Sequence, residues 1–275
     1  MNIIKRNFFR SIRSEVFNTS ELLEPMSLYK WQQLILLAER HRVTSYVVSS
    51  ILNNELHPDF SFPDNIRDEW NGIRRKSISN LSKDTGFVYE KDKMRLNNFF
   101  LNYRLKKIVD NEYHSIDTNT DTLYLLALYI SITSNILRNG IRLHELIELG
   151  EFLRNNGDKV DYVKFDQWIN RLQMRRIITL ESSILIQLFN FSYDEFPFIL
   201  KEERKAEKLT IRDLNSTNSR DLHFKQGNHI LVHNNNNSAV FWHIKHCSRL
   251  MKYYPLEVTS NFLHNFASSL SEIEE

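Results

Sequence analysis

Apolar residues recur at helical spacing along most of the chain. Residues 27–53 hold two such stretches, separated by the segment His41-Arg42-Val43-Thr44. The apolar positions of the first are Leu28, Trp31, Leu34, Ile35 and Ala38, and those of the second are Val47, Val48 and Ile51. Because each set falls on one face of a helix, the pattern predicts two amphipathic helices, with Thr44 as the N-cap of the second.

The N-terminal segment Met1–Phe17 interleaves four basic residues with aliphatic and aromatic ones. It has no continuous apolar stretch, so it is not a secretory signal. The pattern predicts an amphipathic helix that packs on the core, and a membrane-surface or organelle-targeting role is the alternative.

The segment Leu123–Ile132 is apolar at nearly every position, which predicts a helix enclosed by its neighbours at the centre of the core. Asn139-Gly140 is expected to end this helix with a left-handed cap, and Asn156-Gly157 to end the next one in the same way. Asp161 is the expected N-cap of a further short helix.

The stretch 209–238 is rich in Asn and Ser and predicts an irregular or small β excursion. One helical stripe is expected after it, with His243 at its edge and His246 further out. The stripe consists of Val240, Ile244, Cys247, Met251 and Tyr254.

These patterns together predict an all-α protein with about ten helices in an antiparallel array. The expected parts are an N-terminal helical lobe 1–82, a central helical lobe 83–208, the excursion 209–238 and C-terminal helices 239–275 that pack back. One compact domain overall is the alternative.

Composition narrows the functional classes. The six Gly and five Pro among 275 residues disfavour turn-rich β folds and Gly-rich phosphate loops. The net charge of +2 gives no electrostatic case for nucleic acid as a partner. The longest uncharged apolar stretch, Thr122–Leu137, is shorter than the roughly 20 residues that a bilayer requires, so we expect no membrane span and a cytoplasmic protein.

Metal and nucleophile chemistry also lack a sequence signature. The C-terminal third holds a cluster of potential ligands, but their spacing matches no zinc motif; they are His223, His229, His233, His243, His246 and Cys247. No Asp-x-Asp occurs, and Asp117 and Asp121 are expected to cap the central helix. We therefore expect no catalytic residue, no metal and no cofactor.

The most suggestive surface is formed by Arg138, Arg142, His144, Glu145 and Glu148. His144 and Glu148 are spaced i, i+4, and Arg142 and Glu145 are spaced i, i+3, so each pair lies on one helix face. An anion could bind at this helix start. The alternative is a corner between helices that is held by local ion pairs.

Three segments resemble the bacterial family described as uncharacterised nucleotidyltransferases. Phe8 to Ser14, with Trp31 and the run Leu37 to Thr44, resembles that family's N-terminal helices. The stretch Leu125–Leu153, including Leu137-Arg138-Asn139-Gly140-Ile141-Arg142-Leu143, is similar to its C-terminal helical part, and Arg249–Glu257 to its closing segment.

The resemblance lacks the part that carries the family's activity. That part is a Gly-Ser-x-Asp-x-Asp run whose carboxylates hold the metal, and this chain has neither Gly-Ser nor Asp-x-Asp. His144 stands where the family has Arg, and Glu148 where it has Asp. The resemblance therefore implies a non-catalytic helical protein that binds a protein partner, as a regulator or companion of a nucleotidyltransferase. A divergent metal-dependent nucleotidyltransferase is the alternative.

Overall fold

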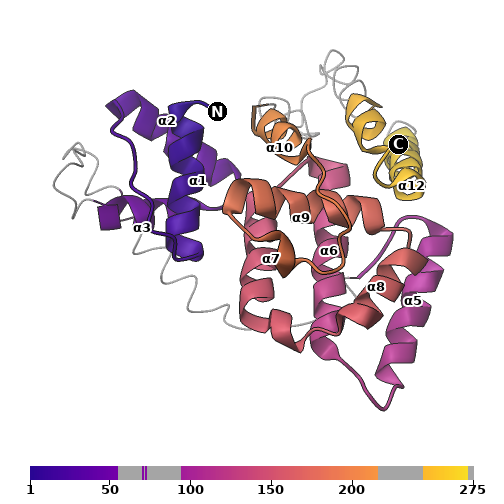
Figure 1. Cartoon of the computed structure of the whole chain (residues 1–275). Helices are drawn as coiled ribbons and strands as arrows, with labels where there is room; N and C mark the ends of the chain where they lie inside the picture. Colours follow the sequence, from indigo (N-terminus) through magenta and orange to yellow (C-terminus); the bar gives the residue numbers. More distant parts are fainter. Residues whose placement is uncertain (55–69, 71, 73–93, 216–243, 272–275) are drawn as a thin grey trace. The chain divides into compact units, whose positions relative to one another are not determined.

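The computed structural model describes residues 1–54, 70, 72, 94–215 and 244–271 (Figure 1). These residues form helices joined by short turns and include no strand, which confirms the predicted all-α class. None of the helices in these ranges is long and apolar enough to cross a membrane.

The chain forms two compact units, each assembled from separate stretches. Unit 1 comprises residues 1–89, 143–151 and 185–191, and unit 2 comprises residues 90–142, 152–184 and 192–275. The division expected from the sequence consists of consecutive segments instead, and it stays a prediction.

The described residues before position 55 give unit 1 the helices α1 (Ile3–Val16), α2 (Leu28–Arg40) and α3 (Thr44–Asn54). The predicted amphipathic character of α1 is confirmed, because Phe8, Phe9 and Ile12 are fully buried while its arginines reach acidic side chains of the following loop. The break between α2 and α3 lies where the sequence predicts it, and Arg42 adopts a positive φ of 56° there. Thr44 is the first residue of α3 rather than its cap.

Segments of two later helices complete unit 1: α7 (Leu143–Asn156) contributes residues 143–151 and α9 (Arg175–Phe189) contributes residues 185–189. The ring of Phe9 packs edge-to-face on Phe189, and that of Phe17 on Phe191. Gly150 of α7 lies against these rings, since a Cβ there would come within 2.9 Å of both Phe17 Cζ and Phe191 Cζ.

Unit 2 contains α5 (Phe99–Tyr113), α6 (Thr120–Asn139), α8 (Tyr162–Arg171), α10 (Ala206–Asn215), α12 (Pro255–Ser271) and the remaining parts of α7 and α9. Residues 244–250 are also helical. As predicted, α6 is enclosed: Leu123, Leu125, Leu126 and Tyr129 have no exposed surface. Two short 3-10 turns, Gly157–Lys159 and Tyr193–Glu195, connect helices of this unit.

The predicted helix ends are correct in position, but the two glycine caps differ from the expected geometry. Gly140 ends α6 with the positive φ of 78° that glycine tolerates, but its ψ of −178° differs from that of a left-handed helical cap. Gly157 follows α7 with a φ of −60° because the chain continues into a 3-10 turn. Asn119, between the two predicted capping acids, is the N-cap of α6, and Asp161 caps α8 as predicted.

Two expectations for the C-terminal third are wrong. The excursion does not begin at residue 209, because residues 209–215 belong to α10; its remainder, 216–238, lies outside the described residues. The expected stripe fails because His246, Cys247 and Leu250 form the buried face of residues 244–250, and residues 251–253 are a turn rather than more helix. His246 is buried, with Nε2 2.6 Å from the carbonyl oxygen of Ile136, whereas Ile244 and Met251 are exposed.

Candidate functional site

The boundary between the two units divides the predicted binding surface. His144, Glu145 and Glu148 belong to unit 1, and Arg138 and Arg142 to unit 2.

In unit 1, His144 and the acids lie on α7. His144 Nε2 is 3.6 Å from Glu145 Oε1. Burial and the charge of Glu148 raise the pKa of Glu151 above its ordinary value. Burial also raises the pKa of Tyr46 to about 12, with contributions from Glu151 and Glu148. The predicted acid Glu148 therefore lies in a group of like charges beside a tyrosine.

In unit 2, a carboxylate of the same chain is bonded to the turn before α7. Asp213 Oδ2, from α10, accepts a hydrogen bond of 3.2 Å from the backbone N–H of Ile141. Arg142 is the N-cap residue of α7 and makes no side-chain capping hydrogen bond. The carboxylate of Asp213 thus bonds to the backbone near the helix start where the sequence suggested that an anion could bind.

Arg138 lies in a polar network at the start of α5. Its Nη2 donates to Asn97 Oδ1 at 3.4 Å. Burial raises the pKa of Glu257, and the charge of Arg138 is among the interactions that partly offset this rise. Glu257 is the third residue of α12 and accepts hydrogen bonds from the backbone N–H groups of Asn97 and Asn98. Asn98 in turn caps α5 through its side chain. This network fixes where α5 begins.

Three exposed aromatic side chains lie on the first turns of α5. Phe99, Phe100 and Tyr103 have exposed fractions of 78%, 72% and 64%, and we call them the aromatic ridge. The Phe99 and Phe100 rings lie edge-to-face with centroids 5.6 Å apart. Single exposed apolar residues are ordinary, but a contiguous group of large ones marks a surface that binds another molecule.

Basic side chains surround the ridge. Arg104, Lys106 and Lys107 are all exposed on the next turn of α5, and Asp110 is the exposed acid that follows. Tyr103 lies one turn from both lysines, since spacings of three and four residues share a helix face. The Arg104 guanidinium also donates to the carbonyl oxygen of Arg171 at the end of α8, at 3.2 Å.

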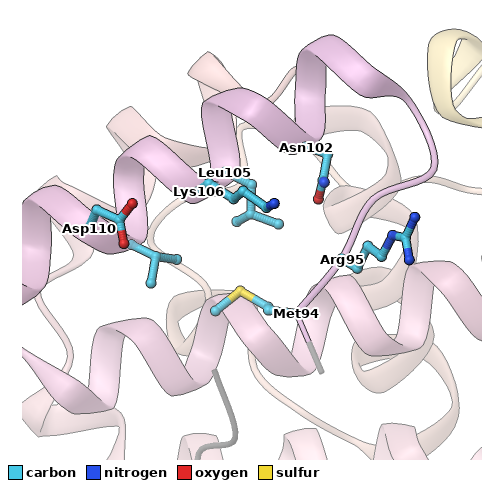
Figure 2. Close-up of a pocket in the computed structure, with 7 residues that line it drawn as sticks. Met94, Arg95, Asn102, Leu105, Lys106 and Asp110 are labelled. Carbon is cyan, nitrogen blue, oxygen red and sulfur yellow. The ribbon is translucent and has the colours of Figure 1, made fainter. Parts of the chain in front are cut away.

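A pocket of about 470 Å³ adjoins the ridge on the next side of α5. Figure 2 shows Met94 and Arg95 on the segment that leads into α5, facing Asn102, Leu105, Lys106 and Asp110 on the helix. Asn102 Oδ1 accepts a hydrogen bond of 3.1 Å from Leu96 N, which ties the segment to the helix. The pocket is lined by three apolar residues, Met94, Leu105 and Val109, and by four polar or charged ones, Arg95, Asn102, Lys106 and Asp110.

Among the residues that the structure describes, no group of three or more His, Cys, Asp and Glu side chains could hold a metal ion. The buried carboxylates of unit 2 have structural partners. Glu112 binds Lys164 Nζ at 3.0 Å and Asn119 N at 2.8 Å, and Glu257 holds the start of α5.

Sequence reasoning did not single out the aromatic ridge, although a signal for it exists. Leu101, Leu105, Ile108 and Val109 define the buried face of α5. At 3.6 residues per turn, Phe99, Phe100 and Tyr103 fall outside that face. They are therefore large aromatic residues that the pattern does not assign to the core.

A scan of family models, a search of curated proteins and a search of solved structures found nothing that matches this chain.

Proposed function

We propose that this chain is a helical binding protein whose aromatic ridge docks a protein partner. The exposure of Phe99, Phe100 and Tyr103 on one helix, next to a pocket, carries the proposal. Aromatic residues and arginine are enriched at protein interfaces, where a few large side chains supply most of the binding free energy.

The charges around the ridge define the partner. Arg104, Lys106 and Lys107 follow it on α5, and Asp110 is the one exposed acid of that helix. The complementary surface is an amphipathic helix with apolar side chains on one face and flanking Asp or Glu residues. One apolar side chain of that helix would enter the α5 pocket, between Met94 and Leu105.

The proposal includes the resemblance to nucleotidyltransferases. In it, the chain keeps that family's helical framework without its metal-binding carboxylates and works as a regulator or companion of such an enzyme. Metal-dependent incorporation of a nucleotide into any acceptor by the purified protein would overturn this part.

Fluorescence anisotropy with two labelled helical peptides of about five turns tests the docking. Both carry leucine along one face; one carries glutamate and the other lysine on the flanks. We expect saturable binding of the glutamate peptide alone. The double variant Phe99→Ser/Phe100→Ser should weaken it more than tenfold, because two central aromatics are lost. Tyr29→Ser is the matched control, since Tyr29 is 68% exposed on α2 of unit 1.

Several results would reject the docking proposal. Equal binding of both peptides, or no effect of the double variant, would show that the ridge does not select an acidic helix. Single-stranded DNA that binds through the same residues would assign the ridge to nucleic acid by base stacking. Self-association that the double variant abolishes would assign it to a second copy of the chain.

A further inference from the structure

A second hollow of unit 2, of about 530 Å³, lies on other elements than the ridge. It is bordered by the start of α9, by residues 201–205 before α10 and by Lys252-Tyr253. We call it the basic groove. Its volume falls within the usual range for small-ligand sites.

The lining of the basic groove is strongly cationic. Its cations are Arg176, Lys201, Arg204, Lys205 and Lys252, against two carboxylates, Glu202 and Glu203. The lining thus carries a larger positive excess than the +2 of the whole chain. Charges gathered in a hollow with protein walls attract anions more strongly than the same charges spread over a surface.

One of the two carboxylates is already neutralised by the groove itself. Glu203 forms an ion pair with Lys252 Nζ at 3.1 Å and accepts a hydrogen bond from Lys205 N at 3.1 Å. Burial raises the pKa of Glu203, and the bonds from Lys252 and Lys205 outweigh that effect and lower it. Lys201, Arg204 and Lys205 remain exposed at the rim.

The wall of the groove also holds a buried hydroxyl. Tyr253 is only 3% exposed, and burial raises the pKa of its hydroxyl, which interacts with Lys252 and Glu203. A buried hydroxyl gains free energy from a partner, so an acceptor in the groove would stabilise it.

We propose that the basic groove binds a ligand through a phosphate monoester group. The planar fork of Arg204 matches two phosphate oxygens. Arg176, whose Nη1 donates to the carbonyl oxygen of Lys252 at 3.4 Å, adds its remaining donors, and Lys201 and Lys205 add charge at the rim. The Tyr253 hydroxyl donates to a phosphate oxygen. The phosphate belongs either to a small molecule or to a phosphorylated side chain of a protein, because both present the same group.

Isothermal titration of the full chain at about physiological ionic strength tests this proposal. The probes are phenyl phosphate, a peptide with one phosphoserine, and the same peptide without phosphate. We expect saturable binding of at least one phosphorylated probe and none of the unmodified peptide. A phosphopeptide that binds more tightly than phenyl phosphate assigns the group to a protein, and the reverse order assigns it to a small molecule.

Variants locate the binding. Lys201→Gln/Arg204→Gln should weaken it more than tenfold, and Tyr253→Phe by about tenfold, the effect of one hydrogen bond to a charged group. The control Lys30→Gln/Lys159→Gln removes the same charge from exposed positions outside the groove and should leave the affinity unchanged. Equal affinities in all variants, or no saturable binding of either phosphorylated probe, would overturn the proposal, and neither result would affect the ridge.

Discussion

The carboxylate of Glu257 accepts a hydrogen bond of 2.9 Å from the backbone N–H of Asn98, the N-cap of α5. The same carboxylate accepts a second bond from Asn97 N at 2.5 Å. One buried side chain of α12 thereby satisfies two backbone donors ahead of α5. The position of the aromatic ridge depends on this contact.

Glu257→Ala should lower the free energy of unfolding by about 1–3 kcal/mol, since two N–H groups lose their acceptor. It should also weaken binding of the glutamate peptide, because the start of α5 is no longer held. Urea denaturation and anisotropy measure the two effects. Ser260→Ala is the control, because it removes only the bond from the Asn98 side chain. A Glu257→Ala variant as stable as Ser260→Ala would contradict the prediction.

Gly150→Ala should destabilise unit 1 although alanine favours a helix. Replacement of a helical glycine gains about 1 kcal/mol, but overpacking costs about 1–3 kcal/mol. Overpacking dominates here because the new Cβ meets two rigid rings, Phe17 and Phe191, at 2.9 Å. Thermal denaturation measures the change.

Two further variants separate overpacking from a general glycine effect. Phe191→Leu should restore part of the stability of Gly150→Ala by removing one of the opposing ring atoms. Gly72→Ala should be neutral or stabilising, because a Cβ there meets no heavy atom of the described structure within 4 Å. A stabilised Gly150→Ala variant would show that the rings move aside freely.

Glu151 predicts a pH dependence of stability. Burial and Glu148 raise its pKa above 4.5, so the folded state holds this proton more tightly than the unfolded chain. Its contribution is therefore most favourable below pH 4.5 and is lost as the pH rises through the folded pKa. Glu151→Gln should raise the Tm at pH 7 and leave it unchanged at about pH 4, where the native carboxyl is also neutral.

The exposed Glu39 of α2 provides a control for the Glu151 prediction. Glu39→Gln removes the same charge without burial and should show no such difference between the two pH values. If Glu151→Gln raised the Tm equally at the two pH values, the ionisation of Glu151 would be excluded as the cause.

The buried pair Thr133 and Glu181 gives a further prediction. Both side chains have no exposed surface, and the Thr133 hydroxyl donates to Glu181 Oε1 at 2.8 Å. Thr133→Val keeps the shape but removes this donor from a buried carboxyl group, which should cost about 1–3 kcal/mol in urea denaturation. Thr210→Val is the matched control: Thr210 is equally buried, but its hydroxyl bonds only to the carbonyl of Ala206 in its own helix. If both variants lost the same free energy of unfolding, the lost bond to the Glu181 carboxyl group would be excluded as the reason for the destabilisation.

The sequence predicted the helices well where one physical signal dominated. The apolar run of α6, the break before Thr44 and the Asp161 cap are set by local residues, and all three were correct in position to within one residue. The stripe after residue 239 failed because His246, Cys247 and Leu250, and not Ile244, form the buried face of residues 244–250. A buried face that tertiary packing selects leaves little trace in local periodicity.

The candidate site was less predictable than the fold. Arg138 was identified, but its partners Asn97 and Glu257 are distant in sequence, so no spacing rule could join them. The aromatic ridge could have been predicted from the sequence, because its three residues fall outside the helical face that the buried apolar residues of α5 define. The basic groove could not, because its cations come from three separate segments whose individual charges resemble ordinary solvated surface.

The aromatic contact between Phe17 and Phe191 has a consequence for synthesis of the chain. Because residues 185–191 belong to unit 1, the ribosome must produce the chain through residue 191 before that unit has all its parts. Until then Phe9 and Phe17 lack the rings of Phe189 and Phe191, so part of the apolar surface of α1 and of the residue that follows it stays uncovered. The helices α1, α2 and α3 are thus made well before the segments of α7 and α9 that pack in their unit.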